Sequence, residues 1–185
     1  MSIRALIKED LRNHGGDSTL PGFRAVAVHR IGHWCMMHRS FTALLCRPLY
    51  WCLYRRVRNH YGIELPWPVS LGRGVIIEHQ GGIVIHALAI IGNGCIIRQG
   101  VTLGNRHAER NNDAPELGEH VSIGAGAKLL GAIKVGNDVS IGANAVVLHD
   151  VRSCTSVAGI PAKEINNNAT FFVSAVSTSG VQAIT

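Results

Sequence analysis

Apolar residues return every six positions through most of the second half of the chain. A first line of such positions consists of Ala89, Cys95, Val101, Val121, Ala127, Ile133, Val139, Ala145 and Val151. A second line lies two residues further on, at Ile91, Ile97, Leu103, Ile123, Leu129, Val135, Ile141 and Val147. Glycine follows the second line at Gly92, Gly104, Gly124, Gly136 and Gly142. Matches to a fixed period are counted to test such a pattern, and two lines of this length indicate a hexapeptide repeat.

A period of six fits neither an α-helix nor a strictly alternating strand, so it predicts short strands that each end in a corner. Glycine or a small polar residue takes the unusual backbone angles at a corner. Three hexads would form one coil, and stacked coils would bury the first residue of each hexad in a central shaft. A sandwich of short strands is the alternative, but its turns would recur at irregular spacings of roughly 8 to 12 residues. The sequence therefore predicts a solenoid.

The period is interrupted between Leu103 and Leu117, where the chain has about eight residues more than the repeat requires. This insertion is long and polar, which is typical of a loop that carries a site on a rigid scaffold. A smaller slip at Gly81 and Gly82 is interpreted as a bulge where the coils begin.

Residues 1–62 carry no hexads and are predicted to form a helical cap that closes one open end of the solenoid. Within it, apolar spacing predicts one helix over Phe23–His38 and a second over Thr42–Tyr61, kinked or begun at Pro48. The coils are expected over 63–163. The tail, 164–185, has too weak a pattern to assign, and we expect it to be disordered.

The second predicted helix mixes large apolar side chains with arginines, and two interpretations follow. The apolar residues are Leu44, Leu45, Leu49, Tyr50, Trp51, Leu53 and Tyr54, and the arginines are Arg47, Arg55, Arg56 and Arg58. Such a helix can lie on an anionic membrane surface. A helix packed in the cap or in a trimer, with the arginines at its rim, is the favoured interpretation.

Composition narrows the function classes further. The net charge of +6 is spread along the chain, and no basic run with interleaved aromatic residues suggests nucleic acid. An anionic small molecule accounts for this charge better. The five cysteines have no metal-ligand spacing, so we expect no metal site, reduced thiols, and Cys95 in the shaft. Without a run of 18 apolar residues or a signal peptide, a cytoplasmic protein is expected.

Several segments resemble one known family. These are Gly22-Phe-Arg-Ala25, His29-Arg-Ile-Gly-His-Trp34, Gly74-Val-Ile-Ile-Glu-His79, Gly100-Val-Thr-Leu-Gly104, Ile123-Gly-Ala-Gly-Ala-Lys128 and Ala158-Gly-Ile-Pro-Ala162. They are similar to segments of the serine acetyltransferases and of their relatives, the colanic acid type of exopolysaccharide acetyltransferases. The resemblance covers residues 20 to 163. It implies a mainly β fold, a left-handed parallel β-helix with a helical N-terminal cap, assembled as a trimer or a dimer of trimers, with acetyl-CoA as acetyl donor.

The resemblance also implies a catalytic pair. In the family, the equivalent of His79 is the general base that takes the proton from the acceptor hydroxyl. A neutral imidazole suits this role near pH 7. An acidic residue just before the first coil orients that imidazole, and Glu64 stands at its place, where serine acetyltransferases usually have Asp.

Residues of the long loop bear on the acceptor. Serine acetyltransferases place an Arg-His pair before the loop proline to hold the amino acid carboxylate, whereas this chain has Asp113-Ala114 before Pro115. The family Asp before the catalytic His is Glu78, and a further family Glu is replaced by Ala87. Glu78, Arg106, His107 and Asp113 are therefore predicted to contact the acceptor. A hydroxyl of a sugar or exopolysaccharide precursor is the favoured acceptor, and L-serine is the alternative.

For acetyl-CoA, the resemblance implies a groove between the coils of two subunits. Small residues and backbone amides at Gly104, Ala125 and Ala143 would hold the pantetheine arm, with Asn105 beside them and Lys128 near the phosphates. A cysteine synthase would bind the C-terminal end if serine is the acceptor. A non-catalytic hexapeptide-repeat scaffold is a further alternative, and it would have no use for Glu64 and His79.

Overall fold

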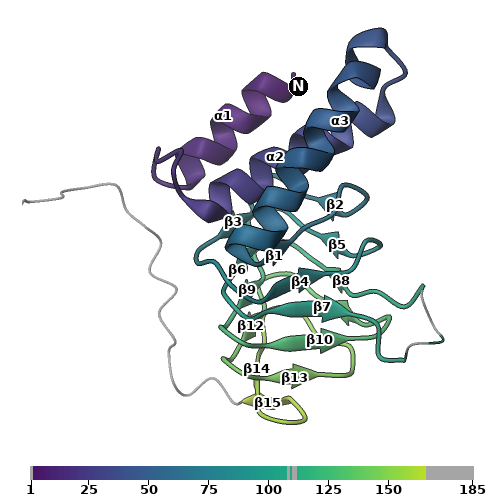
Figure 1. Cartoon of the computed structure of the whole chain (residues 1–185). Helices are drawn as coiled ribbons and strands as arrows, with labels where there is room; N and C mark the ends of the chain where they lie inside the picture. Colours follow the sequence, from purple (N-terminus) through teal and green to yellow (C-terminus); the bar gives the residue numbers. More distant parts are fainter. Residues whose placement is uncertain (1, 108, 110–111, 166–185) are drawn as a thin grey trace, which may run out of the picture.

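Residues 2–107, 109 and 112–165 are described in a computed structural model, in which three helices lie over one end of a three-sided coil (Figure 1). The helical part consists of α1 (Ile3–Asn13), α2 (Pro21–Met37), α3 (Phe41–Arg56) and a short π-helix, η1 (Val57–Tyr61). The strands of the coil begin two residues later, with β1 at Ile63. The predicted tail lies outside the described residues from 166 onward.

Local chemistry sets the helix ends. The hydroxyls of Ser2 and Ser40 accept hydrogen bonds from the backbone N–H groups of Ala5 and Ala43, both at 3.3 Å, and so begin α1 and α3. The predicted helix over Phe23–His38 is found as α2, shifted at its start by Pro21. The helix predicted over Thr42–Tyr61 is found as α3 followed by η1. Of the two alternatives for Pro48, a helix start there is excluded, because Pro48 lies inside α3.

In the described part of the chain, fifteen short strands form three sheets. Sheet A contains β1 (Ile63–Glu64), β4 (Ile83–Ile85), β7 (Thr102–Gly104), β10 (Lys128–Leu130) and β13 (Val146–Val147). Sheet B contains β2 (Ser70–Leu71), β5 (Ile90–Ile91), β8 (Glu116–Leu117) and β11 (Lys134–Val135). Sheet C contains β3 (Ile76–Ile77), β6 (Ile96–Ile97), β9 (Ser122–Ile123), β12 (Ser140–Ile141), β14 (Ser156–Ala158) and the antiparallel β15 (Lys163–Ile165). The chain passes from A to B to C in each coil, and the fold is the left-handed parallel β-helix that the resemblance implied.

The two apolar lines of the sequence form the interior of this coil. Every residue of both lines is buried, and none exposes more than 8% of its surface. Cys95 lies in the shaft as predicted, where burial raises the pKa of its thiol to about 11. The predicted hexapeptide solenoid is therefore confirmed.

The strand register places both interruptions of the period. Thr102 pairs with Val84, 18 residues earlier, which is one regular coil. Ile97 pairs with Ile77, 20 residues earlier, because Gly81 and Gly82 enlarge the corner between β3 and β4. Leu117 pairs with Ile91, 26 residues earlier, so the long loop adds eight residues between β7 and β8.

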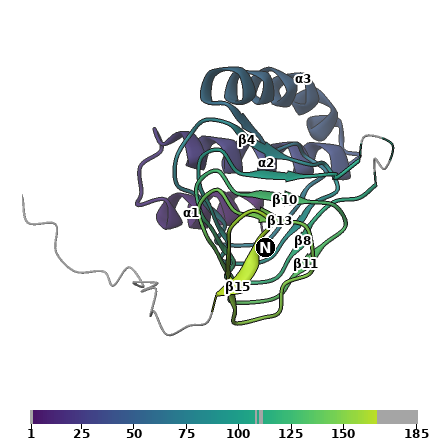
Figure 2. The same cartoon turned by 90° about the horizontal axis from the view of Figure 1, so that it is seen from below.

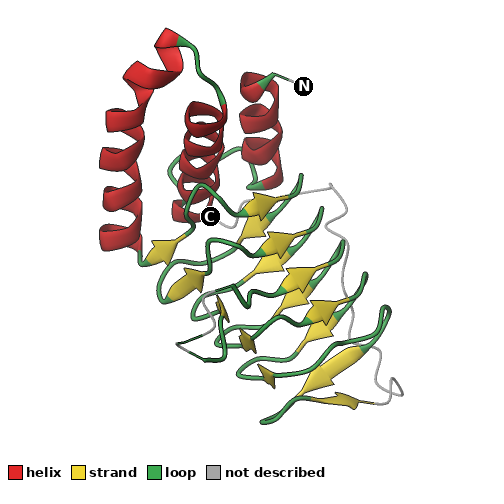
Figure 3. Ribbon diagram, turned by 90° about the vertical axis from the view of Figure 1, so that its right-hand side faces the viewer, coloured by secondary structure: helices red, strands yellow, loops and turns green. Residues whose placement is uncertain are grey.

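The cap closes the first coil (Figure 3). Helix α2 lies so close to β3 that a methyl group on Gly22 would collide with the backbone carbonyl of Ile77. Val26, Tyr50 and Tyr54 from the helices are buried and belong to the same apolar cluster as the shaft. The cap and the coils thus share one continuous core.

Candidate active site

His79 lies on the corner where each coil passes from sheet C to sheet A, which we call the C–A corner. It comprises the turns 78–82, 98–100, 124–126 and 142–144. The turns stack through backbone hydrogen bonds of 2.8 Å, from the N–H groups of Gly100, Gly126 and Asn144 to the carbonyls of Gly81, Gln99 and Ala125. Each of these three donors has a positive φ, between 56° and 76°. This left-handed conformation explains why the repeat places glycine there twice.

The imidazole of His79 is exposed to solvent on the first turn. Among the described residues, no hydrogen bond or ion pair engages it. Both ring nitrogens are therefore accessible to a ligand, as a general base requires.

Glu64 lies near the same corner on β1, half-buried on sheet A and in register with Val84. Gly62, two residues before it, packs against Gly81 and Gly82 of the His79 turn. Within the described part of the chain, no hydrogen bond joins the Glu64 carboxylate to His79. The pKa of Tyr54 is raised, mainly by burial and secondarily by the charge of Glu64, which indicates that this carboxylate lies close to the end of α3.

Glu78 is already paired. Its Oε2 lies 2.6 Å from Nε of Arg98, and Arg98 also donates from Nη1 to the Ser122 hydroxyl at 3.2 Å. Both side chains of the pair are about one third exposed. Sequence reasoning missed Arg98, although its place one coil below Glu78 follows from the register of β3 with β6. An acceptor at Glu78 would therefore meet a carboxylate and a guanidinium together.

Two of the predicted cofactor residues lie in a column with His79. Ala125 and Ala143 follow Ile123 and Ile141 by two residues, as His79 follows Ile77, and these isoleucines are stacked in sheet C through Ile97. Their small side chains leave the backbone of the corner open to close approach. Lys128 lies just beyond, but its ammonium group donates to the carbonyl of Gly100, so it would have to leave that contact to meet a phosphate.

The remaining predicted residues lie on a different corner, where sheet A leads to sheet B. Gly104 ends β7, and the Asn105 side chain donates to the His107 carbonyl at 3.1 Å. Arg106, His107 and Asp113 line a cavity of about 250 Å³ against Leu130–Ile133 and Leu148. Viewed along the coil, the loop extends from one side of the three-sided cross-section (Figure 2). The loop residues and His79 thus lie at opposite ends of the sheet A strands.

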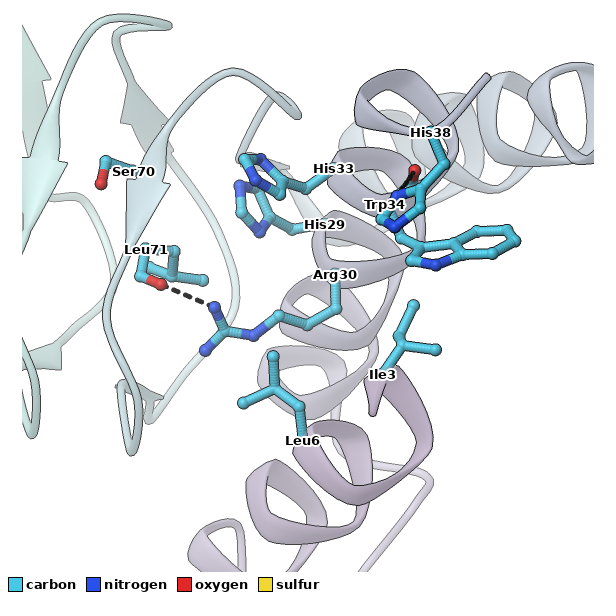
Figure 4. A pocket seen from close by; sticks show the side chains of 9 residues that line it. All are labelled: Ile3, Leu6, His29, Arg30, His33, Trp34, His38, Ser70 and Leu71. Atoms are coloured by element: carbon cyan, nitrogen blue, oxygen red, sulfur yellow. Dashed lines mark hydrogen bonds between the residues drawn. The ribbon is translucent and has the colours of Figure 1, made fainter. Parts of the chain in front are cut away.

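A second cavity, also of about 250 Å³, lies between α1, α2 and β2 (Figure 4). His29, Arg30, His33 and Trp34 line it from α2, and His38 lines it from the position just after this helix. Burial, with a contribution from the charge of Arg30, lowers the pKa of His29 to about 3, so its ring is neutral and Nε2–H donates to the Val69 carbonyl at 3.0 Å. This cavity has no counterpart in the sequence predictions.

A buried ion pair lies beside that cavity. Nε of Arg30 donates to Asp10 at 3.0 Å, and the two terminal nitrogens donate to the carbonyls of Leu71 and Gly72 at 2.7 and 2.6 Å. These contacts tie α1, α2 and β2 together. No group of three or more metal-ligating side chains is found in the part of the chain that the structure describes.

The stacked hexads and the histidine-bearing corner place the molecule among the hexapeptide-repeat proteins. The profile described as bacterial transferase hexapeptide (six repeats) matches residues 114–149. The serine acetyltransferase of Synechococcus elongatus is 41% identical over 145 residues, which cover 78% of this chain and 57% of that protein. The serine acetyltransferase of Helicobacter pylori is 39% identical over 148 residues, covering 80% of this chain and 83% of that protein.

Solved structures that are similar to this chain are also serine acetyltransferases. A serine acetyltransferase in complex with CoA has a TM-score of 0.72 at 31% identity, covering 89% of this chain and 70% of that one. The Neisseria gonorrhoeae serine acetyltransferase in complex with serine has a TM-score of 0.74 at 29% identity, covering 89% of this chain and 69% of that one. The chain belongs to the serine acetyltransferase family. It spans only 50% to 57% of the length of its Escherichia coli and Synechococcus relatives.

Proposed function

We propose that the chain is an acetyl-CoA-dependent O-acetyltransferase with its reaction centre at the C–A corner. The observation that carries the proposal is the exposed His79, without a partner among the described residues, above the small residues Ala125 and Ala143 in a chain of this family. An imidazole at this position can take a proton from a hydroxyl bound beside it. A scaffold without activity would not need it.

The reaction needs one proton to move twice. Nε2 or Nδ1 of His79 takes the proton from the acceptor hydroxyl as its oxygen attacks the acetyl carbonyl carbon. The thioester C–S bond then breaks, and the imidazolium gives the proton to the CoA sulfur. The products are an O-acetyl ester and free CoA. Glu64 would stabilise the imidazolium, for which its carboxylate must approach the ring when substrates bind.

Acetyl-CoA is proposed to run along the column of Ala125 and Ala143, where a thin pantetheine arm can approach the backbone. Lys128 stands beside this column at the start of β10. Gly104 and Asn105 complete the proposed cofactor set from the other end of the sheet A strands. Because these groups lie on two corners of one chain, a groove that uses both requires a second copy of the chain. This supports the trimeric assembly, or a dimer of trimers, that the resemblance implies.

L-serine is the first candidate for the acceptor, because the relatives and structural neighbours named above are serine acetyltransferases and one of them is solved with serine. The preference for a sugar hydroxyl, drawn from the loop, has no support among these relatives. One observation keeps it as a second candidate. Asp113 and Ala114 stand where the family has its carboxylate-holding pair, and a carboxylate beside Asp113 would be repelled.

The acceptor is tested by measuring thiol release from acetyl-CoA with L-serine and with a panel of sugar nucleotides and oligosaccharides. We expect release with L-serine to exceed release with every saccharide. Release with a saccharide and none with serine would transfer the proposal to the sugar acceptor. Failure to bind acetyl-CoA would overturn the acetyltransferase proposal itself.

Asp113→Arg refines this test. If serine is the acceptor, and residue 113 reaches the site from a second copy of the chain, a cation at this position should raise the specificity constant for serine about tenfold, since a charged hydrogen bond contributes about 1.5 kcal/mol. Glu109→Arg, the same charge change at an exposed position of the same loop, is the control. Ala114 is buried, so a histidine there would disturb packing and is left out of the test.

A further inference from the structure

The outward face of α3 is apolar although nothing in the described chain covers it. Tyr50 and Tyr54 point into the cap and are buried. On the opposite side, Phe41, Leu44, Leu45, Leu49 and Trp51 have exposed fractions between 44% and 75%. Pro48 and Cys52 lie among them and are also exposed. These seven residues form what we call the outer face of α3.

Helical geometry makes this face continuous. Positions 41, 44, 45, 48, 49 and 52 are linked by spacings of three and four residues, so they share one side of the helix. The exposed Met37 extends the apolar surface at the turn before α3. Single exposed apolar side chains are ordinary on a protein surface, but a contiguous group of this size marks an interaction site.

The charged residues of α3 itself, and of the turns that flank it, all have one sign. Residues 18–63 contain seven arginines and neither Asp nor Glu. Arg55 and Arg56 are exposed in the last turn of α3. Arg39 is exposed two residues before α3 begins. Within the described residues, none of these three guanidinium groups has a hydrogen bond or ion pair. Basic groups therefore stand at both ends of the apolar stretch.

We infer that the outer face of α3 binds the surface of an anionic membrane. Leucine, phenylalanine and tryptophan side chains would enter the boundary between headgroups and acyl chains, while Arg39, Arg55 and Arg56 pair with anionic headgroups. The helix would lie in the plane of the interface. None of the described helices is long and apolar enough to cross a bilayer.

Charge favours this occupant over a second copy of the chain. If two outer faces met with their helices parallel, Arg55 and Arg56 of one copy would face the same residues of the other. If they met antiparallel, these arginines would face Arg39 of the other copy. Neither arrangement offers an acidic partner from α3 or its flanking segments, because residues 18–63 contain neither Asp nor Glu and the half-buried Glu64 lies beside the buried Tyr54. An anionic lipid surface supplies negative charge at both ends.

Co-sedimentation with vesicles tests the inference on the full chain. We expect at least tenfold more protein to bind vesicles of phosphatidylglycerol mixed with phosphatidylcholine than vesicles of phosphatidylcholine alone, and less to bind as salt increases. The double variant Leu45→Ser with Leu49→Ser and the double variant Arg55→Glu with Arg56→Glu should each lose at least tenfold of this binding. Leu88→Ser, an exposed leucine between β4 and β5, is the matched control and should bind as the unmodified chain does.

Thermal unfolding of each variant, followed by circular dichroism, confirms that it folds. Sedimentation velocity of the same proteins without lipid measures self-association. Equal binding to both kinds of vesicle, or unchanged binding by the folded double variants, would overturn the inference. A smaller assembly for Leu45→Ser with Leu49→Ser, together with no vesicle binding by the unmodified chain, would make the outer face a contact between copies instead.

Discussion

The coils and the cap of this molecule are held together by different kinds of interaction. In the coils, equivalent apolar residues repeat at each level, such as Ile97, Ile123 and Ile141 stacked in sheet C. In the cap, single polar contacts without any repeat fix the helices, above all the buried pair of Arg30 and Asp10. A repeat distributes stability over many similar contacts, whereas the cap concentrates it in a few. The following predictions test this difference.

Removing one charge from the cap should have the largest effect on stability. Asp10→Ala leaves the Arg30 guanidinium buried without its carboxylate, which typically costs about 3 to 5 kcal/mol. The free energy of unfolding, measured by chemical denaturation, should fall by an amount in this range. Glu9→Ala, on the same helix, is the control: it breaks the pair with the largely exposed Arg73 and should cost much less stability. Equal losses for the two variants would mean that the buried pair is not what holds the cap.

Truncating one shaft residue should have a slightly smaller effect, and one that repeats along the coils. Ile97→Ala, Ile123→Ala and Ile141→Ala each remove a buried side chain from an equivalent position, at a typical cost of about 2 to 5 kcal/mol. We expect the three losses to lie within about 1 kcal/mol of one another, as measured by denaturant unfolding. A spread much wider than this would show that the coils are not energetically equivalent.

The same difference explains how much the sequence could predict. The coils were found by counting, because every inward position of the two lines must be apolar to be buried. The cap contacts were not, because Asp10 and Arg30 are 20 residues apart and follow no period. Likewise, the long loop was located by its eight extra residues, but its separation from His79 required the three-dimensional path of the coil.

The candidate site, like the fold, was predicted from the sequence only where its residues follow the repeat. His79, Ala125 and Ala143 share a corner, as a six-residue period allows one to expect. Arg98 was missed because its link to Glu78 depends on the two extra residues at Gly81 and Gly82, which bring the two into register. The direct contact of Glu64 with His79 stays a prediction.

Over the range from pH 7 to pH 5, the pH dependence of the cap's stability should be the smallest of these effects. His29 is neutral in the folded chain, with a pKa of about 3, whereas its pKa in the unfolded chain is near 6.5. Below pH 6.5 the unfolded chain binds a proton that the folded chain does not. As the pH is lowered from 6.5 to about 3, the contribution of His29 to the free energy of unfolding should therefore fall by up to about 1.4 kcal/mol per pH unit.

His29→Gln removes this titration and keeps an N–H donor for the Val69 carbonyl. Unfolding free energies measured at pH 7 and pH 5 should differ less for this variant than for the unmodified chain. His149→Gln, at an exposed histidine of the coils, should keep the original pH dependence. An unchanged pH dependence in His29→Gln would assign the acid sensitivity to other groups.

The role of His79 is tested by comparing turnover and acetyl-CoA binding in His79→Ala, with His149→Ala as the control. A general base acts on the acceptor rather than on the cofactor, so binding of acetyl-CoA by calorimetry should be nearly unchanged. Acceptor-dependent thiol release should fall by roughly 10² to 10⁴, while His149→Ala keeps the original rate. A loss of turnover of less than about threefold in His79→Ala would remove His79, and with it the C–A corner, from the proposed mechanism.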